Sequence, residues 1–125
     1  MKKVLLLTIS IFLISIAHAA FAYAELASSG RINGIKDYQN AAPAYEMAAL
    51  ADIPEACKKA GEYYLKGLGV VRDLEKALDY YLKASLLGDN ESTIMVNIIK
   101  KQIDLINTRP QHSWCHFFKK SFNPF

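Results

Sequence analysis

The feature that most constrains how this chain can fold is an internal repeat with a period of 36 residues. At that shift, six identities fall in order without a gap: Asp37 and Asp73, Ala41 and Ala77, Tyr45 and Tyr81, Ala48 and Ala84, Leu50 and Leu86, Glu55 and Glu91. A repeat of this length is one supersecondary unit, which must stack on its neighbours to cover its apolar face. The period therefore predicts an array of small stacked units.

The apolar residues within each unit have helical spacing. Leu74, Ala77, Leu78, Tyr81 and Ala84 follow the i, i+3, i+4, i+7 pattern of one helix face. No stretch of the sequence has the alternating pattern of a strand. The predicted fold class is all-α, a short α/α solenoid of antiparallel helix pairs that follows an N-terminal signal peptide. Its helices are expected at about 37–51, 53–66, 72–87 and 90–106.

Helix boundaries are marked by capping and turn residues. Asp37 and Asp73 are placed to accept hydrogen bonds from the free amides of a first turn, and Asp52 precedes an Ile-Pro-Glu sequence that suits a helix start. Gly67 and Gly69 lie between two helices, where a left-handed cap and a tight turn are expected. These residues predict two helices joined by a short turn in each unit.

The segment EACKKAGEYYLKGLGVVRDLEKALDYYLKASLLGD, which begins at Glu55, resembles one complete Sel-1-like repeat, a relative of the tetratricopeptide repeat. The resemblance implies a full repeat at about 53–88, with half repeats on either side, in a repeat region that covers 37–106. The residues that match the family's structural signature are Ala56, Gly61, Tyr64, Gly67, Gly69, Val70, Asp73, Lys76, Ala77, Tyr80, Tyr81, Ala84 and Gly88.

The flanking half repeats depart from the family pattern. Asp52 stands where glycine is usual, and the helix after Ser92 lacks the glycine turn. That last helix is expected to cap the stack, with Ile94, Ile98 and Ile99 packing inward. Because stable stacks usually need about three units, a partner, self-association or the C-terminal tail is expected to assist this one.

The resemblance implies an adaptor that binds another protein and has neither enzymatic activity nor a cofactor. The residues expected near its concave surface are Lys59, Glu62, Tyr63 and Lys66. One alternative is the weak penicillin-binding or β-lactamase activity of a cysteine-rich bacterial subgroup. Cys57 holds the first position of that subgroup's cysteine pair, but Ser85 holds the second. Another alternative is a truncated relic of a longer repeat protein.

The N-terminus has the pattern of a secretory signal peptide. Two lysines precede the apolar run from Val4 to Ile16, and alanines with A-x-A spacing follow. Cleavage is possible after Ala19, Ala22 or Ala24, and we expect the last, with residues 1–24 removed and 25–36 a flexible leader. The expected location is the periplasm or the medium. The alternative is an uncleaved segment that holds the chain in the inner membrane.

Net charge argues against nucleic-acid binding. The whole chain carries +3, and removal of Lys2 and Lys3 with the signal peptide lowers this to +1. Of the remaining basic residues, Arg109, Lys119 and Lys120 lie in the tail, which leaves residues 25–108 with a charge near −2. A body of that sign has no basic patch for a phosphate backbone.

The sequence contains few residues that could support catalysis. It has no motif of a serine hydrolase, a zinc protease or a phosphate-binding loop. His112, Cys115 and His116 resemble part of a zinc site, but no fourth ligand is evident, so no metal is expected. Cys57 and Cys115 are a possible disulfide pair in an exported chain. The aromatic and basic tail, 107–125, could cap the stack, remain disordered, or contact a membrane or partner.

Overall fold

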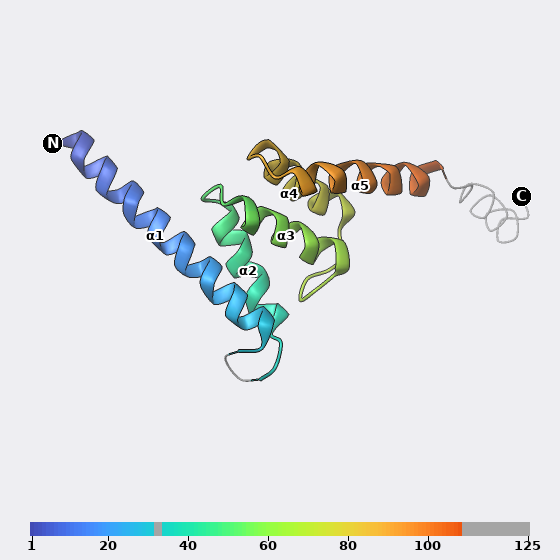
Figure 1. Ribbon diagram of the computed structural model, residues 1–125, viewed down its shortest axis with the longest axis horizontal. Helices are drawn as coiled ribbons and strands as arrows, with labels where there is room; N and C mark the ends of the chain where they lie inside the picture. Colours follow the sequence, from blue (N-terminus) through green and yellow to red (C-terminus); the bar gives the residue numbers. More distant parts are fainter. Residues whose placement is uncertain (32–33, 109–125) are drawn as a thin grey trace, which may run out of the picture.

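The computed structural model describes residues 1–31 and 34–108, and within them the chain forms five α-helices and no strand (Figure 1). Each helix packs against the next one along the chain. The last four agree with the predicted helices to within two residues at each end, so the all-α prediction is confirmed. The helices are α1 (Lys2–Ser29), α2 (Tyr38–Ala49), α3 (Pro54–Lys66), α4 (Leu74–Leu86) and α5 (Asn90–Thr108).

Aspartates cap three of the helices. The carboxylate of Asp37 accepts a hydrogen bond from the Asn40 amide at 3.1 Å, and that of Asp73 accepts one from the Lys76 amide at 3.0 Å. Asp89 caps α5 in the same way, accepting from the Ser92 amide at 2.8 Å. These bonds satisfy amides that have no partner within the helix.

The predicted cap at Asp52 is wrong. The residue that precedes α3 is Ile53, and no side chain accepts a hydrogen bond there. Asp52 instead has a φ of 59°, in the left-handed region that favours glycine. The equivalent position in the next repeat is Gly88, whose φ is 103°. The backbone therefore makes the same turn in both repeats, although only one of them has glycine.

We expect Asp73→Ala to lower the free energy of unfolding by about 1 kcal/mol, because the Lys76 amide loses its acceptor at the start of α4. Glu75→Ala is the matched control, since Glu75 is exposed in the same turn and caps nothing. Urea unfolding followed by circular dichroism measures both. Equal losses in the two variants would contradict the capping role of Asp73.

The core repeats with the period found in the sequence. The equivalent positions of α2 and α4 are buried in pairs: Ala41 with Ala77, Tyr45 with Tyr81, and Ala48 with Ala84. The alanines let neighbouring helices approach closely, and the tyrosine rings fill the space beside them. The two tyrosines are alike in burial but differ in their neighbours. Tyr45 packs on Phe21 and Tyr63, whereas Tyr81 packs over Gly61.

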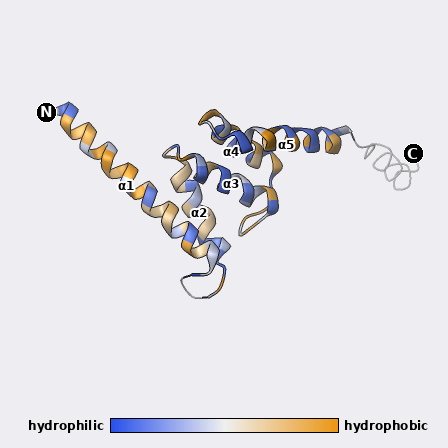
Figure 2. Ribbon diagram, in the orientation of Figure 1, coloured by the Kyte–Doolittle hydropathy of each residue, from blue (hydrophilic) through white to orange (hydrophobic). Residues whose placement is uncertain are grey.

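The first helix has two parts with different surroundings. Its N-terminal part is apolar and exposed, and it extends away from the stack (Figures 1 and 2). By length and composition α1 could cross a membrane. Its C-terminal part packs against α2 and buries Ala24 and Ala27. The expectation of a flexible leader from residue 25 is therefore wrong for 25–29, which are helical.

The last helix buries a narrower strip than expected. Ile99 and Val96 lie in the core, but Ile94 and Ile98 are 62% and 45% exposed. The inward packing predicted for those two isoleucines is wrong. Among the described helices α5 packs mainly against α4, and one main neighbour covers only one side.

Candidate functional site

A groove of about 590 Å³ runs along the face formed by α1, α3 and α5. Most of its lining comes from α3, which lies between the other two helices, and Tyr81 of α4 also contributes. Both apolar and charged side chains line it. The lining residues are Phe21, Glu25, Glu55, Lys58, Lys59, Glu62, Leu65, Lys66, Tyr81, Glu91 and Met95.

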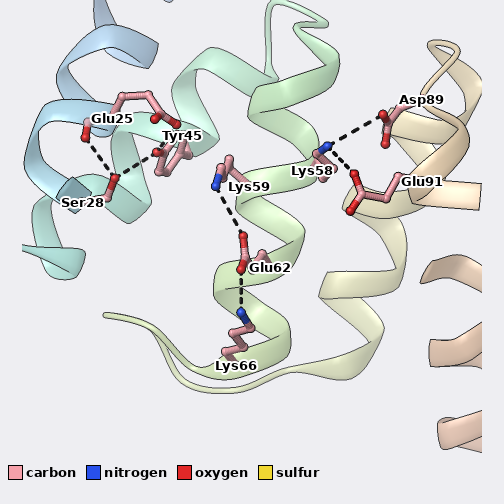
Figure 3. A network of polar contacts seen from close by, with 9 residues as sticks. All are labelled: Glu25, Ser28, Tyr45, Lys58, Lys59, Glu62, Lys66, Asp89 and Glu91. Carbon is pink, nitrogen blue, oxygen red and sulfur yellow. Dashed lines mark hydrogen bonds and ion pairs between the residues drawn. The ribbon is translucent and has the colours of Figure 1, made fainter. Parts of the chain in front are cut away.

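Three of the four predicted binding residues line this groove. Lys59, Glu62 and Lys66 project from one side of α3 (Figure 3). Tyr63, the fourth, does not, because it is only 4% exposed and packs between Tyr38 and Tyr45. Helix α3 is packed on both sides, by α2 and by α4, so its buried face is wider than that of a surface helix. Tyr63 is therefore a core residue.

Glu62 lies between two lysines on α3. Its carboxylate is 2.6 Å from Lys66 Nζ and 3.7 Å from Lys59 Nζ. Partial burial opposes ionisation of this carboxyl group, but the hydrogen bond from Lys66 and the charge of Lys59 outweigh it and lower the pKa of Glu62. The groove thus holds an ionised carboxylate with two ammonium groups beside it.

Lys58 connects α3 to the start of α5. Its ammonium group is 2.8 Å from the Glu91 carboxylate and 3.9 Å from that of Asp89 (Figure 3). The hydrogen bond to Glu91 raises the pKa of Lys58, so the lysine stays charged. Exposed ion pairs of this kind stabilise a fold by about 0–1 kcal/mol each. These charges therefore contribute little to stability and remain available to a ligand.

The other wall of the groove is held by a polar contact between α1 and α2. The Tyr45 hydroxyl donates to Glu25 Oε1 at 2.6 Å and lies 3.2 Å from Ser28 Oγ (Figure 3). Burial, followed by the bond to Glu25, raises the pKa of Tyr45 well above its usual range. Glu25 is thus fixed in position beside Phe21 at the groove wall.

The hydroxyl group of Tyr63 has no hydrogen-bond partner within the described part of the chain, although it is buried. A buried polar group without a partner costs about 1–3 kcal/mol. We therefore expect Tyr63→Phe to raise the free energy of unfolding by about 1 kcal/mol. Tyr45→Phe is the matched control and should lower it by about 1 kcal/mol, because the bond to Glu25 is lost. Urea unfolding measures both, and a loss of stability in Tyr63→Phe would contradict the expectation.

The predicted signature residues occupy structural positions. Ala56, Gly61, Ala77, Tyr81 and Ala84 are buried between helices. Gly67 and Gly69 have φ angles of 72° and 67° in the turn between α3 and α4, and Gly88 has a positive φ after α4. Tyr64 donates a hydrogen bond from α3 to Glu46 of α2 at 2.6 Å. These residues shape the stack and do not line the groove, with the exception of Tyr81.

The predicted cysteine pair is only half described. Cys57 is buried on α3, its thiol 3.8 Å from the Ala49 carbonyl, and burial raises the pKa of that thiol. Cys115 lies outside the described residues, as do His112 and His116. Within residues 1–31 and 34–108, no group of three or more His, Cys, Asp or Glu side chains is placed to hold a metal ion.

The sequence prediction missed the groove residues that lie outside the α3 face, notably Phe21 and Glu25 on α1 and Met95 on α5. A usable signal was present. Ala24, Ala60 and Val96 stand 36 residues apart and are all buried, and they mark the same position on α1, α3 and α5.

Comparison with known proteins gives one match. The family model described as Sel1 repeat matches residues 54–89, which correspond to α3, the glycine turn and α4. Neither the curated proteins nor the solved structures include a match to the chain. The matched segment supplies most of the groove's lining.

Proposed function

Since this chain carries a Sel1 repeat at residues 54–89, and such repeats are typically protein interaction modules, we propose that it is an adaptor of the bacterial envelope. Its ligand is a polypeptide segment that binds in the groove between α1, α3 and α5. The observation that carries the proposal is the convergence of three helices from successive repeats on one groove. Extended concave surfaces of this kind are how stacked helical repeats bind their partners.

The chemistry of the groove suggests what the bound segment looks like. Lys58, Lys59 and Lys66 alternate with Glu25 and other carboxylates, so the groove favours a segment with charges of both signs. Phe21, Leu65 and Met95 add apolar surface on which one aliphatic or aromatic side chain of the partner can rest. This mixed lining suits recognition of a polypeptide better than the positioning of a small substrate.

Export belongs to the same proposal. The apolar run from Val4 to Ile16, preceded by two lysines, supports translocation across the inner membrane. Fractionation of cells that make the full chain tests this part. We expect the protein in the periplasmic fraction or the medium, and its presence only in the cytoplasm would contradict an envelope role.

Site-specific photo-crosslinking in living cells tests the groove. A photoreactive amino acid at Lys59 or Lys66 faces the groove, whereas the same residue at Glu75 or Asp79 lies on the exposed surface of α4. We expect one discrete adduct from both groove positions and none from the α4 positions. Adducts of equal yield on both faces, or on α4 alone, would overturn the proposed site.

A further inference from the structure

The 36-residue period continues into α1, upstream of the residues at which the sequence identities begin. The inward positions of α3 are Ala56, Ala60 and Tyr63, and their equivalents are Ser92, Val96 and Ile99 on α5 and Ala20, Ala24 and Ala27 on α1. All of these residues are buried except Ala20, which is half-buried. The C-terminal part of α1 thus takes the place of the first helix of a repeat whose second helix is α2.

Specific contacts close this first repeat. The Phe21 ring meets the Tyr45 ring edge-on, with the centroids 5.9 Å apart. The Tyr45 hydroxyl donates to Glu25 at 2.6 Å, and the Asp37 amide donates to the Ala27 carbonyl at 2.9 Å. The packed part of α1 begins at Ala17, which is 4% exposed, and its ring and hydrogen-bond contacts begin at Phe21. Both residues lie within the segment that the signal-peptide pattern marks for removal.

Packing of α1 on α2 is incompatible with a membrane span by the same helix. The exposed part, residues 2–16, is about 22 Å long at 1.5 Å per residue, and the hydrocarbon core is about 30 Å thick. A span that continued through Ala17 would bring the end of α2 into the bilayer, because Leu50 and Asp52 lie beside Ala17. Asp52 forms an ion pair with Lys83 at 3.1 Å. Charged groups at that depth are costly.

The three candidate cleavage sites differ in what they leave of this helix. Cleavage after Ala24 removes Phe21 and Ala24 and leaves five helical residues, too few to form a stable helix. Cleavage after Ala22 also removes Phe21. Cleavage after Ala19 removes the exposed apolar run together with one buried residue, Ala17. It keeps the contacts of Phe21, Glu25 and Ala27 with α2 and its flanking residues.

We infer that the signal peptide is removed at the Ala19–Ala20 bond and that residues 20–29 are the first helix of the mature stack. A signal peptidase adds water across that peptide bond. Ala19 gains a carboxylate on the released peptide, and Ala20 gains the free amino group of the mature chain. The small residues required next to the cut are Ala17 and Ala19, and the mature chain keeps Phe21 and Glu25 in the wall of the groove.

The intact mass and N-terminal sequence of the exported protein, made from the full chain with its own signal, test this inference. We expect the mature chain to begin at Ala20. A chain that begins at Tyr23 or Glu25, or that keeps Met1, overturns the inference. The inference rests on the export part of the proposed function but not on partner binding. A different N-terminus would therefore contradict this inference without affecting the crosslinking test of the groove.

Two matched variants locate the cut independently. Ala19 and Ala22 are both exposed on α1, so lysine is tolerated at either position in the folded chain. Ala19→Lys blocks the predicted cut and should cause the precursor to accumulate. Ala22→Lys blocks both alternative cuts, because Ala22 is the last residue before one of them and the third residue before the other. It should leave a mature N-terminus at Ala20. The opposite pattern overturns the inference.

A stability measurement tests the structural half of the inference. Mature chains that begin at Ala20 and at Glu25 are compared by thermal unfolding with circular dichroism. We expect the melting temperature of the shorter chain to be lower by at least about 10 °C, since it lacks the packing of Phe21 and Ala24 on α2. Equal melting temperatures would show that residues 20–24 are not part of the stack.

Discussion

Gly61→Leu is expected to abolish cooperative folding of the stack, with a loss of more than about 4 kcal/mol in the free energy of unfolding. Gly61 lies on α3 where it crosses α4. A Cβ atom at this position would lie 2.9 Å from Tyr81 Cδ2 and 3.3 Å from the Ala77 carbonyl oxygen. Leucine adds three further carbon atoms in the same direction. Because a small domain is stable by only about 5–15 kcal/mol, such a loss removes much of what is available.

The ring of Tyr81 cannot readily move away from an added side chain at Gly61. It is 4% exposed and packs in the cluster with Tyr64, Ala77, Val96 and Ile99. Overpacking a core of this density costs about 1–3 kcal/mol even for small additions. The α3–α4 crossing therefore depends on the absence of a side chain at this one position.

Lys66→Leu is the matched control, since it adds leucine to an exposed position of the same helix. It should change the unfolding free energy by less than about 1 kcal/mol, its ion pair with Glu62 being a surface contact. Circular dichroism during urea unfolding compares the two variants. The double variant with Tyr81→Ala should regain about 1–3 kcal/mol relative to additivity. A stable Gly61→Leu single variant would contradict the packing described here.

The sequence alone predicts the repeat region well, because each repeat carries its own boundary residues. Asp37 and Asp73 mark the starts of α2 and α4, and Gly67 and Gly69 mark the turn that precedes α4. These are local properties: an aspartate caps, and a glycine adopts a positive φ, with little dependence on the rest of the chain. The glycine turn and the caps are also the residues on which the resemblance to the Sel1 repeat rests.

The helical end of α1 at residues 25–29 was not predicted, because small residues serve two roles in one segment. Ala20 and Ala24 stand at positions of candidate A-x-A cleavage sites, and the same small side chains, with that of Ala27, let α1 pack closely on α2. The run of six identities begins only at Asp37, so the match of Ala24 with Ala60 is an isolated identity upstream of that run. A pattern of small residues does not distinguish a cleavage site from a helix crossing.

Only charged residues of the groove on α3 were predicted from the sequence. Lys59, Glu62 and Lys66 are charged residues between the family's packing positions, and such residues are expected to be exposed. Tyr63 occupies the adjacent position but is buried. How much of a helix is buried depends on how many neighbours it has, and this is a tertiary property that the sequence of one helix does not contain.

The stability of the stack is expected to fall steeply between pH 10 and 12. Tyr45 and Tyr81 are buried, and burial raises the pKa of Tyr81 to about 12 and that of Tyr45 further. An unfolded tyrosine has a pKa near 10. Below pH 10 the hydroxyl is protonated in both states, so stability is at its full value. Above pH 10 the unfolded chain loses the proton first, and the unfolded state gains stability.

Each of these tyrosines contributes a slope of about 1.4 kcal/mol per pH unit in that range, so together they remove about 3–4 kcal/mol by pH 11.5. Urea unfolding at intervals from pH 8 to pH 11.5 measures the loss. Tyr81→Phe removes one ionisable group from the core and should reduce the slope by about 1.4 kcal/mol per pH unit. The slope should not vanish, because burial also raises the pKa values of Tyr63, Tyr64 and Tyr80. Tyr23→Phe, at an exposed position, should leave the slope unchanged.

Lysine deprotonation also contributes in this pH range, and the tyrosine variants separate the two effects. The pKa values of Lys58 and Lys66 are raised by hydrogen bonds to Glu91 and Glu62, so these bonds weaken as the pH rises through those values. Both lysines are partly or fully exposed, and their loss costs little. The slope of stability against pH in Tyr81→Phe could equal that of the unmodified chain. In that case the alkaline loss of stability would come from surface groups, and the burial of the Tyr81 hydroxyl in the core would be contradicted.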